Sequence, residues 1–337
     1  MVYRTLVQRS AFAILLAGAI AASSTTALLA ADANTEFYRG KTVTYIVATS
    51  PGGGHDFYGR MAARHMERFL PGSTFVIRNV PGAGHLLGAN TIYGSKPDGL
   101  TIGTFSTGLT VSQIVGKEGV RYDLTKMSWV GKGATDTRVL IFADKSGYKT
   151  FDDLKNSKRE IKMATGGVGA GDYNETLIVA SVFKLPLKPL LGYGGGERSM
   201  AMMRGEVDGT IGGLSSAEEF GAASHGRIIL AFGNDVPGAT NARDVATSEI
   251  QRKVVALIEG QGSLYRFCVG PPNIPADRLA ALRQAFMAAY TSPELIKEAG
   301  KRPLDPLGGE AVAALVKDVM EQPPEIVTML KGLSWAE

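Results

Sequence analysis

The chain has 337 residues, 45% hydrophobic and 20% charged, a composition that excludes a wholly disordered or fibrous protein. Its 36 Lys and Arg against 32 Asp and Glu leave a net charge of +4, which is too small to indicate nucleic-acid binding. The single cysteine, Cys268, excludes an internal disulfide framework and a thiolate-rich zinc site. The length predicts about two domains.

Residues 1–33 have the pattern of a secretory signal peptide. Arg4 and Arg9 precede an apolar run of 12 residues, Ala11–Ala22, and Ala31-Asp32-Ala33 offers a cleavage site. A run of this length is too short to span a membrane, which takes about 20 residues. We therefore expect this segment to be removed and the rest of the chain to be exported as a soluble protein.

The first part of the exported chain alternates strands with helices. β-Branched and apolar runs predict the strands, and apolar residues at three-to-four spacing predict the helices. The predicted order is strand 42–48, helix 55–70, strand 74–78, short helix 85–94 and strand 100–105. Such alternation favours a parallel sheet with helices on its faces.

A second series of the same kind follows and ends in a helical tail. Its predicted strands are 139–143, 161–164, 187–191, 207–211, 228–232 and 264–269. Its predicted helices are 150–155, 172–183, 197–204 and 247–259, and the tail adds helices 276–290, 293–300 and 309–320. Two such α/β units indicate two lobes with a cleft between them.

Three glycine-rich segments connect a predicted strand to a predicted helix: residues 51–54, 166–169 and 194–196. Such loops lie at the carboxyl ends of parallel strands, where open α/β sheets bind ligands. Glycine lets successive N–H groups converge, and the first helical N–H groups favour an anion such as a carboxylate or phosphate. Each loop alone is also explained as a tight turn. None carries the nucleotide or dinucleotide patterns GxxxxGK[ST] and GxGxxG with a following acid.

An ordered set of motifs resembles a known family. The motifs are Tyr38–Lys41 followed by Ser50–Asp56 (SPGGGHD), Arg78–Gly84 (RNVPGAG), Lys96–Thr101 (KPDGLT), Thr165–Gly171 (TGGVGAG), Arg204–Gly209 (RGEVDG) and Arg266–Pro275. Together they resemble the tripartite tricarboxylate transporter receptors, the Bug/TctC-type solute-binding proteins. The resemblance runs in order along essentially the whole exported chain.

The resemblance implies an α/β type II periplasmic-binding-protein fold, with two lobes around a ligand cleft. Lobe 1 would comprise residues 34–134 plus 264–337 and lobe 2 residues 135–263, with crossings near 131–137 and 260–266. It also implies a monomer in the periplasm that captures a small organic carboxylate and passes it to the membrane permease subunits of a tripartite tricarboxylate-type transporter. No cofactor, metal, nucleic acid or catalytic step is expected.

The expected ligand contacts come from the glycine loops and from one strand end. They are Ser50, Pro51, Gly52, Gly53, Gly54, His55 and Asp56; Thr104, Ser106 and Thr107; Gly166, Gly167, Val168, Gly169, Ala170 and Asp172; and Tyr193, Gly194 and Glu197. Asp56 is interpreted first as a helix N-cap and second as a residue that orders the first loop. Asp172 and Glu197 depart from the family pattern. They predict that the distal half of the binding site is less cationic. This disfavours a tricarboxylate and favours a monocarboxylate, an aromatic acid or a ligand with a distal amine or hydroxyl.

Two other functions stay open at this point. A sensor module that binds the same ligands but docks to a signalling protein has the same sequence features. A secreted hydrolase is disfavoured because the chain has no G-x-S-x-G elbow and no evident Cys/His arrangement. The scattered histidines His65, His85 and His225 do not predict a metal site.

Overall fold

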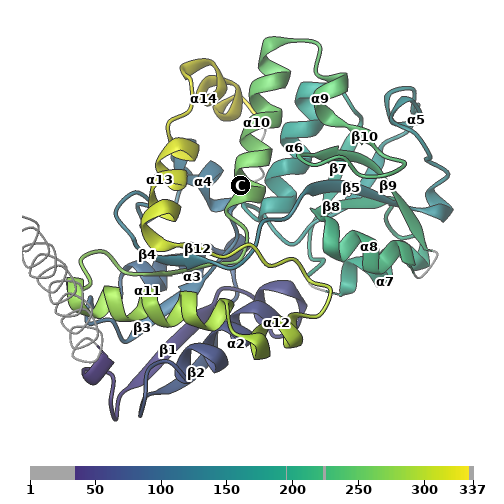
Figure 1. The fold of residues 1–337 in the computed structure, drawn as a ribbon. Coiled ribbons are helices and arrows are strands. Elements are labelled where there is room, and N and C mark those ends of the chain that lie inside the picture. The colour runs from purple at the N-terminus through teal and green to yellow at the C-terminus, as the bar shows by residue number, and fades with distance from the viewer. Residues whose placement is uncertain (1–34, 195, 223–224, 334–337) are drawn as a thin grey trace, which may run out of the picture.

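A computed structural model describes residues 35–333 apart from 195 and 223–224 (Figure 1). The predicted signal peptide and Gly195 of the third loop lie outside the described residues. Figure 1 shows two sheets in separate halves of the molecule. We call the half with β1–β3 the first lobe and the half with β5–β9 the second lobe.

The sheet of the first lobe has the strand order β12-β4-β11-β3-β1-β2. Strands β2, β1 and β3 are parallel, as the alternation predicts, whereas β11, β4 and β12 pair antiparallel. The strands are β1 (Thr42–Val47), β2 (Thr74–Asn79), β3 (Thr101–Thr104), β4 (Ser128–Lys132), β11 (Phe267–Gly270) and β12 (Leu307–Gly308). The helices are α2 (Gly53–Glu67), the 3-10 turn η1 (Ala83–His85), α3 (Leu86–Tyr93), α4 (Leu109–Ile114), α11 (Ala276–Tyr290), α12 (Pro293–Ala299), α13 (Gly309–Met320) and α14 (Pro324–Lys331).

The sheet of the second lobe has the order β10-β9-β5-β8-β6-β7. Strands β7, β6 and β8 are parallel, and β5 runs antiparallel between β8 and β9. The strands are β5 (Arg138–Ala143), β6 (Ile161–Ala164), β7 (Leu187–Leu190), β8 (Gly209–Gly213), β9 (Gly226–Phe232) and β10 (Thr240–Asn241). The helices are η2 (Asp144–Ser146), α5 (Phe151–Lys155), α6 (Gly171–Phe183), α7 (Glu197–Arg204), α8 (Leu214–Ala222), α9 (Ala242–Val245) and α10 (Glu249–Ser263).

Each sheet is therefore mixed rather than purely parallel. The strand that breaks the parallel order follows a crossing between the lobes: β5 enters the second sheet and β11 re-enters the first. Local sequence does predict both strands. It does not predict their direction, because direction depends on which sheet the chain has just left.

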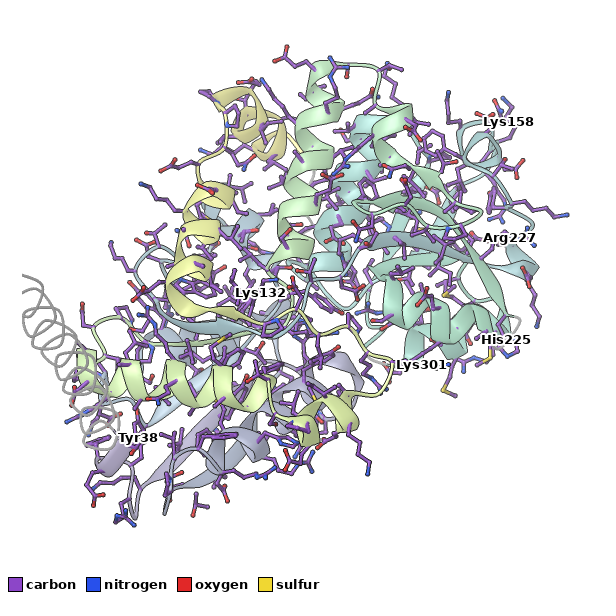
Figure 2. The ribbon with its side chains drawn as sticks, in the orientation of Figure 1. Tyr38, Lys132, Lys158, His225, Arg227 and Lys301 are labelled. Carbon is purple, nitrogen blue, oxygen red and sulfur yellow. The ribbon has the colours of Figure 1, made fainter. Side chains whose placement is uncertain are left out.

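The two crossing segments are hydrogen-bonded to each other. Gly133 N donates to Arg266 O at 2.9 Å, and Ala134 N donates to Tyr265 O at 3.3 Å. Lys132, labelled near the centre of Figure 2, ends β4, and its buried ammonium donates to Asp305 Oδ2 at 2.6 Å. The crossings thus form a short antiparallel ribbon. The predicted lobe boundaries at 134/135 and 263/264 stay a prediction.

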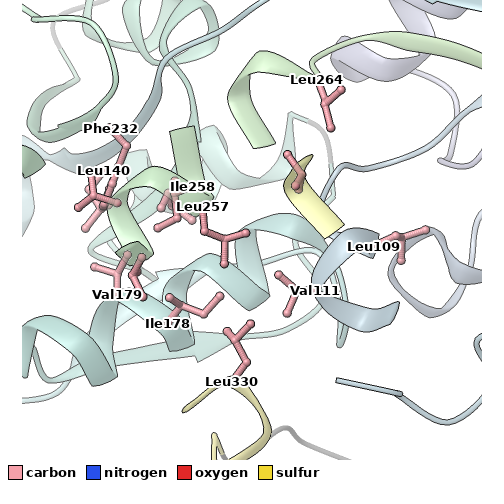
Figure 3. Close-up of a cluster of buried hydrophobic side chains, with 14 of the residues drawn as sticks. Leu109, Val111, Leu140, Ile178, Val179, Phe232, Leu257, Ile258, Leu264 and Leu330 are labelled. Atoms are coloured by element: carbon pink, nitrogen blue, oxygen red, sulfur yellow. The ribbon is translucent and has the colours of Figure 1, made fainter. Parts of the chain in front are cut away.

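A shared apolar cluster connects helices of both lobes. Figure 3 shows Leu109 of α4, Ile178 of α6, Leu257 of α10 and Leu330 of α14 in this cluster. Helices α13 and α14 pack against α10. The C-terminal helices therefore cover part of the second lobe's α10 as well as the first lobe's β4.

Candidate ligand-binding site

All three predicted glycine loops connect a strand to a helix. Residues 51–54 follow β1 and enter α2, residues 166–169 follow β6, and the third loop follows β7 and enters α7. β1, β6 and β7 each pair with a parallel neighbour, so the loops emerge at carboxyl ends of parallel strands. The first N–H groups of a helix have no intrahelical acceptor and lie at the positive end of its dipole. This arrangement favours an anion.

Asp56 orders the first loop from inside α2. The N-cap of α2 is Gly52, which has no side chain to cap the helix, so the predicted N-cap role of Asp56 is wrong. Its Oδ2 instead accepts from Gly52 N at 3.0 Å and from Arg60 Nε at 2.9 Å, and Asn79 Nδ2 donates to its Oδ1 at 2.9 Å. Burial opposes the charge of Asp56, but these hydrogen bonds lower its pKa overall. The carboxylate therefore fixes the turn that precedes the helix.

Asp172 does the same for the second loop. Its Oδ2 accepts from Gly166 N at 3.1 Å and forms an ion pair with Arg198 Nη2 at 2.6 Å. Asp172 is buried, so this pair is screened little by water. The guanidinium of Arg198 therefore offsets the carboxylate that the sequence adds to this loop, and the loop is less acidic than its sequence suggests.

A second ion pair lines the cleft, between Arg138 and Glu175. Arg138, the first residue of β5, donates through Nε to Glu175 Oε1 at 3.0 Å, and its Nη2 lies 2.5 Å from Glu175 Oε2. The Glu175 side chain is 1% exposed and that of Arg138 is 11% exposed. Burial raises the pKa of Glu175, and the charge of Arg138 opposes that rise. Fork-like pairing of this kind holds a buried carboxylate in a defined position.

An exposed acidic side chain, Glu197, also accepts a hydrogen bond from the backbone of the third loop. Glu197 Oε2 accepts from Gly194 N at 3.0 Å, and Arg198 Nε donates to Tyr193 O at 2.9 Å. The Tyr193 ring packs against an apolar cluster of the second lobe. Tyr193 therefore contacts Arg198 through its backbone carbonyl and not through its side chain.

A cleft of about 2030 Å³ is lined by residues of both lobes. Sixteen of the nineteen predicted contacts lie along it: Ser50, Pro51, Gly52, Gly53, Gly54, His55, Asp56, Ser106, Thr107, Gly166, Gly167, Val168, Ala170, Asp172, Gly194 and Glu197. Thr104, Gly169 and Tyr193 are not among its lining residues. All three glycine loops therefore face one space.

The lobes meet closely at one side of this cleft. A Cβ atom added to Gly84 would lie 2.4 Å from Ala170 N, and one added to Gly108 would lie 2.3 Å from Gly171 Cα. Asn174 Nδ2 donates to Gly108 O at 3.0 Å across the same contact. Glycine at these positions lets the two backbones approach each other.

Sequence reasoning missed four polar residues, three of them arginines, that line the cleft outside the predicted loops. Arg138, Arg198, Tyr265 and Arg266 all line the cleft. The signal available was weak: an arginine at the start of an apolar strand, and Glu175 among the polar residues that open a helix with an apolar second half. Neither position belongs to a glycine motif, so only the fold brings them to the loops.

His55, in the first turn of α2, and His85, the N-cap of α3, lie against each other. Their ring centroids are 5.2 Å apart. Burial, and after it the charge of Arg266, holds the pKa of His55 well below its usual value, and burial lowers the pKa of His85 to about 4. Both imidazoles are therefore neutral near pH 7 and can each donate one hydrogen bond.

Metal and membrane features are absent from the part of the chain that the structure describes. Among residues 35–333, apart from 195 and 223–224, no three His, Cys, Asp or Glu side chains gather as a metal site would require. Within the same residues, none of the helices combines the length and the apolar character needed to cross a membrane.

Residues 59–330 match the profile of the tripartite tricarboxylate transporter family receptors, TctC. A UPF0065 protein of Bordetella pertussis is 26% identical over 294 residues, which cover 84% of this chain and 88% of that protein. The periplasmic binding protein BugD superposes with a TM-score of 0.71 at 17% identity, covering 87% of this chain and 98% of BugD. MatC from Rhodopseudomonas palustris, solved with bound malate, superposes with a TM-score of 0.70 at 18% identity, covering 85% and 99%.

These structures share the two-lobed α/β fold of periplasmic binding proteins, and the family match spans most of the chain. The chain belongs to the tripartite tricarboxylate transporter receptor family, the TctC-type periplasmic solute-binding proteins.

Proposed function

We propose that this receptor captures a small organic carboxylate between its lobes and delivers it to the membrane permease of a tripartite tricarboxylate-type transporter. Family membership supports the receptor role, and the malate held by MatC supports a carboxylate ligand. The single observation that carries the proposal is that glycine loops of both lobes face one cleft. No catalytic step is part of it.

The backbone supplies the proposed anion contacts. The N–H groups of Gly53 and Gly54 belong to the first turn of α2 and have no intrahelical acceptor. Gly167 and Val168 lie opposite them in the second lobe and line the same cleft. We assign the carboxylate to these N–H groups, with Ser106 as a hydroxyl donor beside them. Ordered water can complete such contacts at little loss of strength.

Capture would proceed by closure of the lobes about the paired crossings. A ligand that contacts both loops binds the closed form more tightly than the open form, and it therefore shifts the population toward closure. The closed form is what the permease would recognise. We further propose that the protein acts as a monomer in the periplasm after removal of residues 1–33, with lobes of 34–134 plus 264–337 and of 135–263.

Native mass spectrometry of the exported form, with a thermal-shift panel of mono-, di-, tricarboxylic and aromatic acids, tests the ligand class. A bound ligand stabilises the folded state by an amount that grows with the logarithm of its concentration relative to its Kd, so a true ligand raises the Tm. A stabilising or co-purified acid supports the proposal. No shift from any acid at millimolar concentration contradicts it.

Gly167→Val tests the loop contacts. At Gly167 an added Cβ would meet only Gly84 N, at 3.8 Å, so the substitution fits the fold but fills the space in front of the loop. We expect binding to weaken about 10- to 100-fold for each ligand hydrogen bond that the valine blocks. Gly308→Val is the matched control, because an added Cβ there meets nothing within 4 Å and the residue does not line the cleft. Equal affinity in the two variants contradicts the loop assignment. Gly53→Val is less suitable because Gly53 has a φ of 78°.

Deletion of the gene separates delivery from sensing. Loss of uptake of the identified acid, with induction of its pathway intact, supports the carrier. Loss of induction with uptake intact contradicts the permease partnership and supports a signalling partner instead.

A further inference from the structure

Arg266 occupies the ribbon between the lobes in an unusual backbone conformation. It follows the C-terminal end of α10 and precedes β11, and its carbonyl accepts from Gly133 N at 2.9 Å. Its φ is +58°, in the left-handed region that a non-glycine residue adopts at a free-energy cost. This backbone geometry directs a long cationic side chain from the ribbon into the cleft, which Arg266 lines.

The guanidinium of Arg266 lies against the first turn of α2. A Cβ atom added to Gly54 would lie 2.1 Å from Arg266 Nη2, so glycine at this position makes room for the guanidinium. The guanidinium carbon is 3.9 Å from the centroid of the Tyr265 ring and 5.1 Å from that of Tyr58. Nη2 donates to Tyr265 Oη. Two aromatic rings and a glycine backbone thus hold the charge in one place.

This buried cation is left without an acceptor for two of its nitrogens. Arg266 is 7% exposed, yet among the residues that the structure describes nothing accepts a hydrogen bond from its Nε or Nη1. The two partly buried arginines of the cleft differ: Arg138 is paired with Glu175, and Arg198 with Asp172. A buried charge without a partner destabilises the folded state strongly. A ligand anion is the partner that would remove this penalty.

We propose that Arg266 and the first turn of α2 together form the anchor for one carboxylate group of the ligand. This rests on the proposed carboxylate-binding function and deepens it. The helix end contributes N–H groups of Gly53 and Gly54, and the guanidinium contributes a full positive charge beside them. Charge-assisted hydrogen bonds are about twice as strong as neutral ones. Arg138 and Arg198 already have ion-pair partners, whereas no ion pair of Arg266 is found among the described residues. The buried carboxyl of Asp136 acts on Arg266 only at longer range, so a ligand carboxylate would be its direct partner.

The anchor strengthens a preference that the backbone alone gives only weakly. The helix end favours an anion through the partial charges of its N–H groups, whereas the guanidinium adds a full positive charge that a neutral carbonyl oxygen does not compensate. The ligand is therefore an acid that presents at least one ionised carboxylate, and its amide analogue binds poorly.

Arg266→Gln separates this role from a structural one. Succinate, malate and adipate, and the diamide of each, are the probes, and thermal shift and calorimetry are the readouts. We expect the variant to bind the acids about 10- to 100-fold more weakly and to lose the discrimination between acid and diamide. We also expect the unliganded Tm to stay within a few degrees of the wild type or to rise, because an unpaired buried charge is removed.

Arg278→Gln is the matched control. The Arg278 guanidinium also stacks on an aromatic ring, with its carbon 3.8 Å from the Phe37 centroid, and it donates to Asp98 O at 2.9 Å, but it does not line the cleft. This variant should lower the unliganded Tm and keep the full acid-induced shift. The two arginines should therefore show opposite effects on stability and binding.

Each outcome decides the matter. A wild type that binds neither these three acids nor any other acid of the thermal-shift panel overturns the carboxylate function and the anchor with it; an acid from that panel that does bind replaces the three as the probe. A wild type that binds an acid, with Arg266→Gln binding it equally well, overturns the anchor alone. Should Arg266→Gln fail to fold, Gly54→Ala decides, since the added Cβ displaces the guanidinium at a helical position that tolerates alanine; unchanged acid affinity in that variant also overturns the anchor.

Discussion

Replacing Glu175 by Gln should destabilise the second lobe far more than its single lost charge suggests. The Glu175 side chain is 1% exposed, and the Arg138 guanidinium that it binds is 11% exposed. Glutamine keeps the size of the side chain but leaves the guanidinium buried and uncompensated. The loss therefore comes mainly from the orphaned charge and not from the missing attraction.

Breaking a buried ion pair on one side destabilises proteins by about 3–5 kcal/mol. With an unfolding entropy of about 2.1 cal/mol/K per residue, a chain of about 300 residues loses about 1.6 °C of Tm for each 1 kcal/mol, so we expect a fall of about 5–8 °C. The matched control is Glu160→Gln. Its partner Lys188 is 51% exposed and Glu160 itself 66% exposed, at a similar separation of 2.7 Å. An exposed pair contributes about 0–1 kcal/mol.

Thermal and urea unfolding of both variants, without added ligand, measure the difference. The double variant Arg138→Met/Glu175→Leu should recover most of the lost stability, because apolar side chains of similar volume remove both charges together. A Glu175→Gln variant that loses no more stability than Glu160→Gln would refute the role given to the orphaned charge. A double variant less stable than Glu175→Gln alone would refute it as well.

Three further predictions rest on single residues. Gly108→Ala places a Cβ 2.3 Å from Gly171 Cα and should hold the lobes apart; small-angle scattering of the variant should give a larger radius of gyration, and an unchanged radius would contradict this. Burial lowers the pKa of His85 to about 4, so the unfolded chain binds more protons between about pH 6.5 and 4. Its contribution to stability is complete above pH 6.5 and is lost as the pH falls. In His85→Asn, the free energy of unfolding measured with urea should therefore depend less on pH over that range. Burial raises the pKa of the Cys268 thiol to about 12, so iodoacetamide at pH 8 should label it only after unfolding; rapid labelling of the native protein would disprove its burial.

Local patterns predicted most elements because their periodicity is strong. The helices 197–204, 276–290 and 309–320 and the strand 161–164 have the predicted bounds. Strand β4 was missed, because Gly131 and Lys132 interrupt its short apolar run, although the sheet buries all five of its residues. The strand predicted at 264–269 begins at Phe267 instead, since residues 264–266 lead out of α10 and turn at Arg266.

The sequence predicted the parts of the candidate site that are continuous in the chain. It did not predict the parts that the fold brings together from distant residues. Glycine loops are continuous in sequence, and sixteen of the nineteen predicted contacts line the cleft. The arginines could not be found in the same way. Arg198 meets Asp172 and Arg138 meets Glu175 only because α7, β5 and α6 converge, and the sign of the cleft's charge depends on those pairings.

The strand order of the first lobe also constrains when that lobe can be completed. β11 inserts between β3 and β4, and Val269 pairs with Gly103 from the far side of the whole second lobe. The second sheet, in contrast, is built from one unbroken stretch of chain. Contacts between residues distant in sequence form late because closing the intervening loop is entropically unfavourable. The second lobe can therefore fold as a unit first, and its folding brings the ends of the first lobe's two halves together.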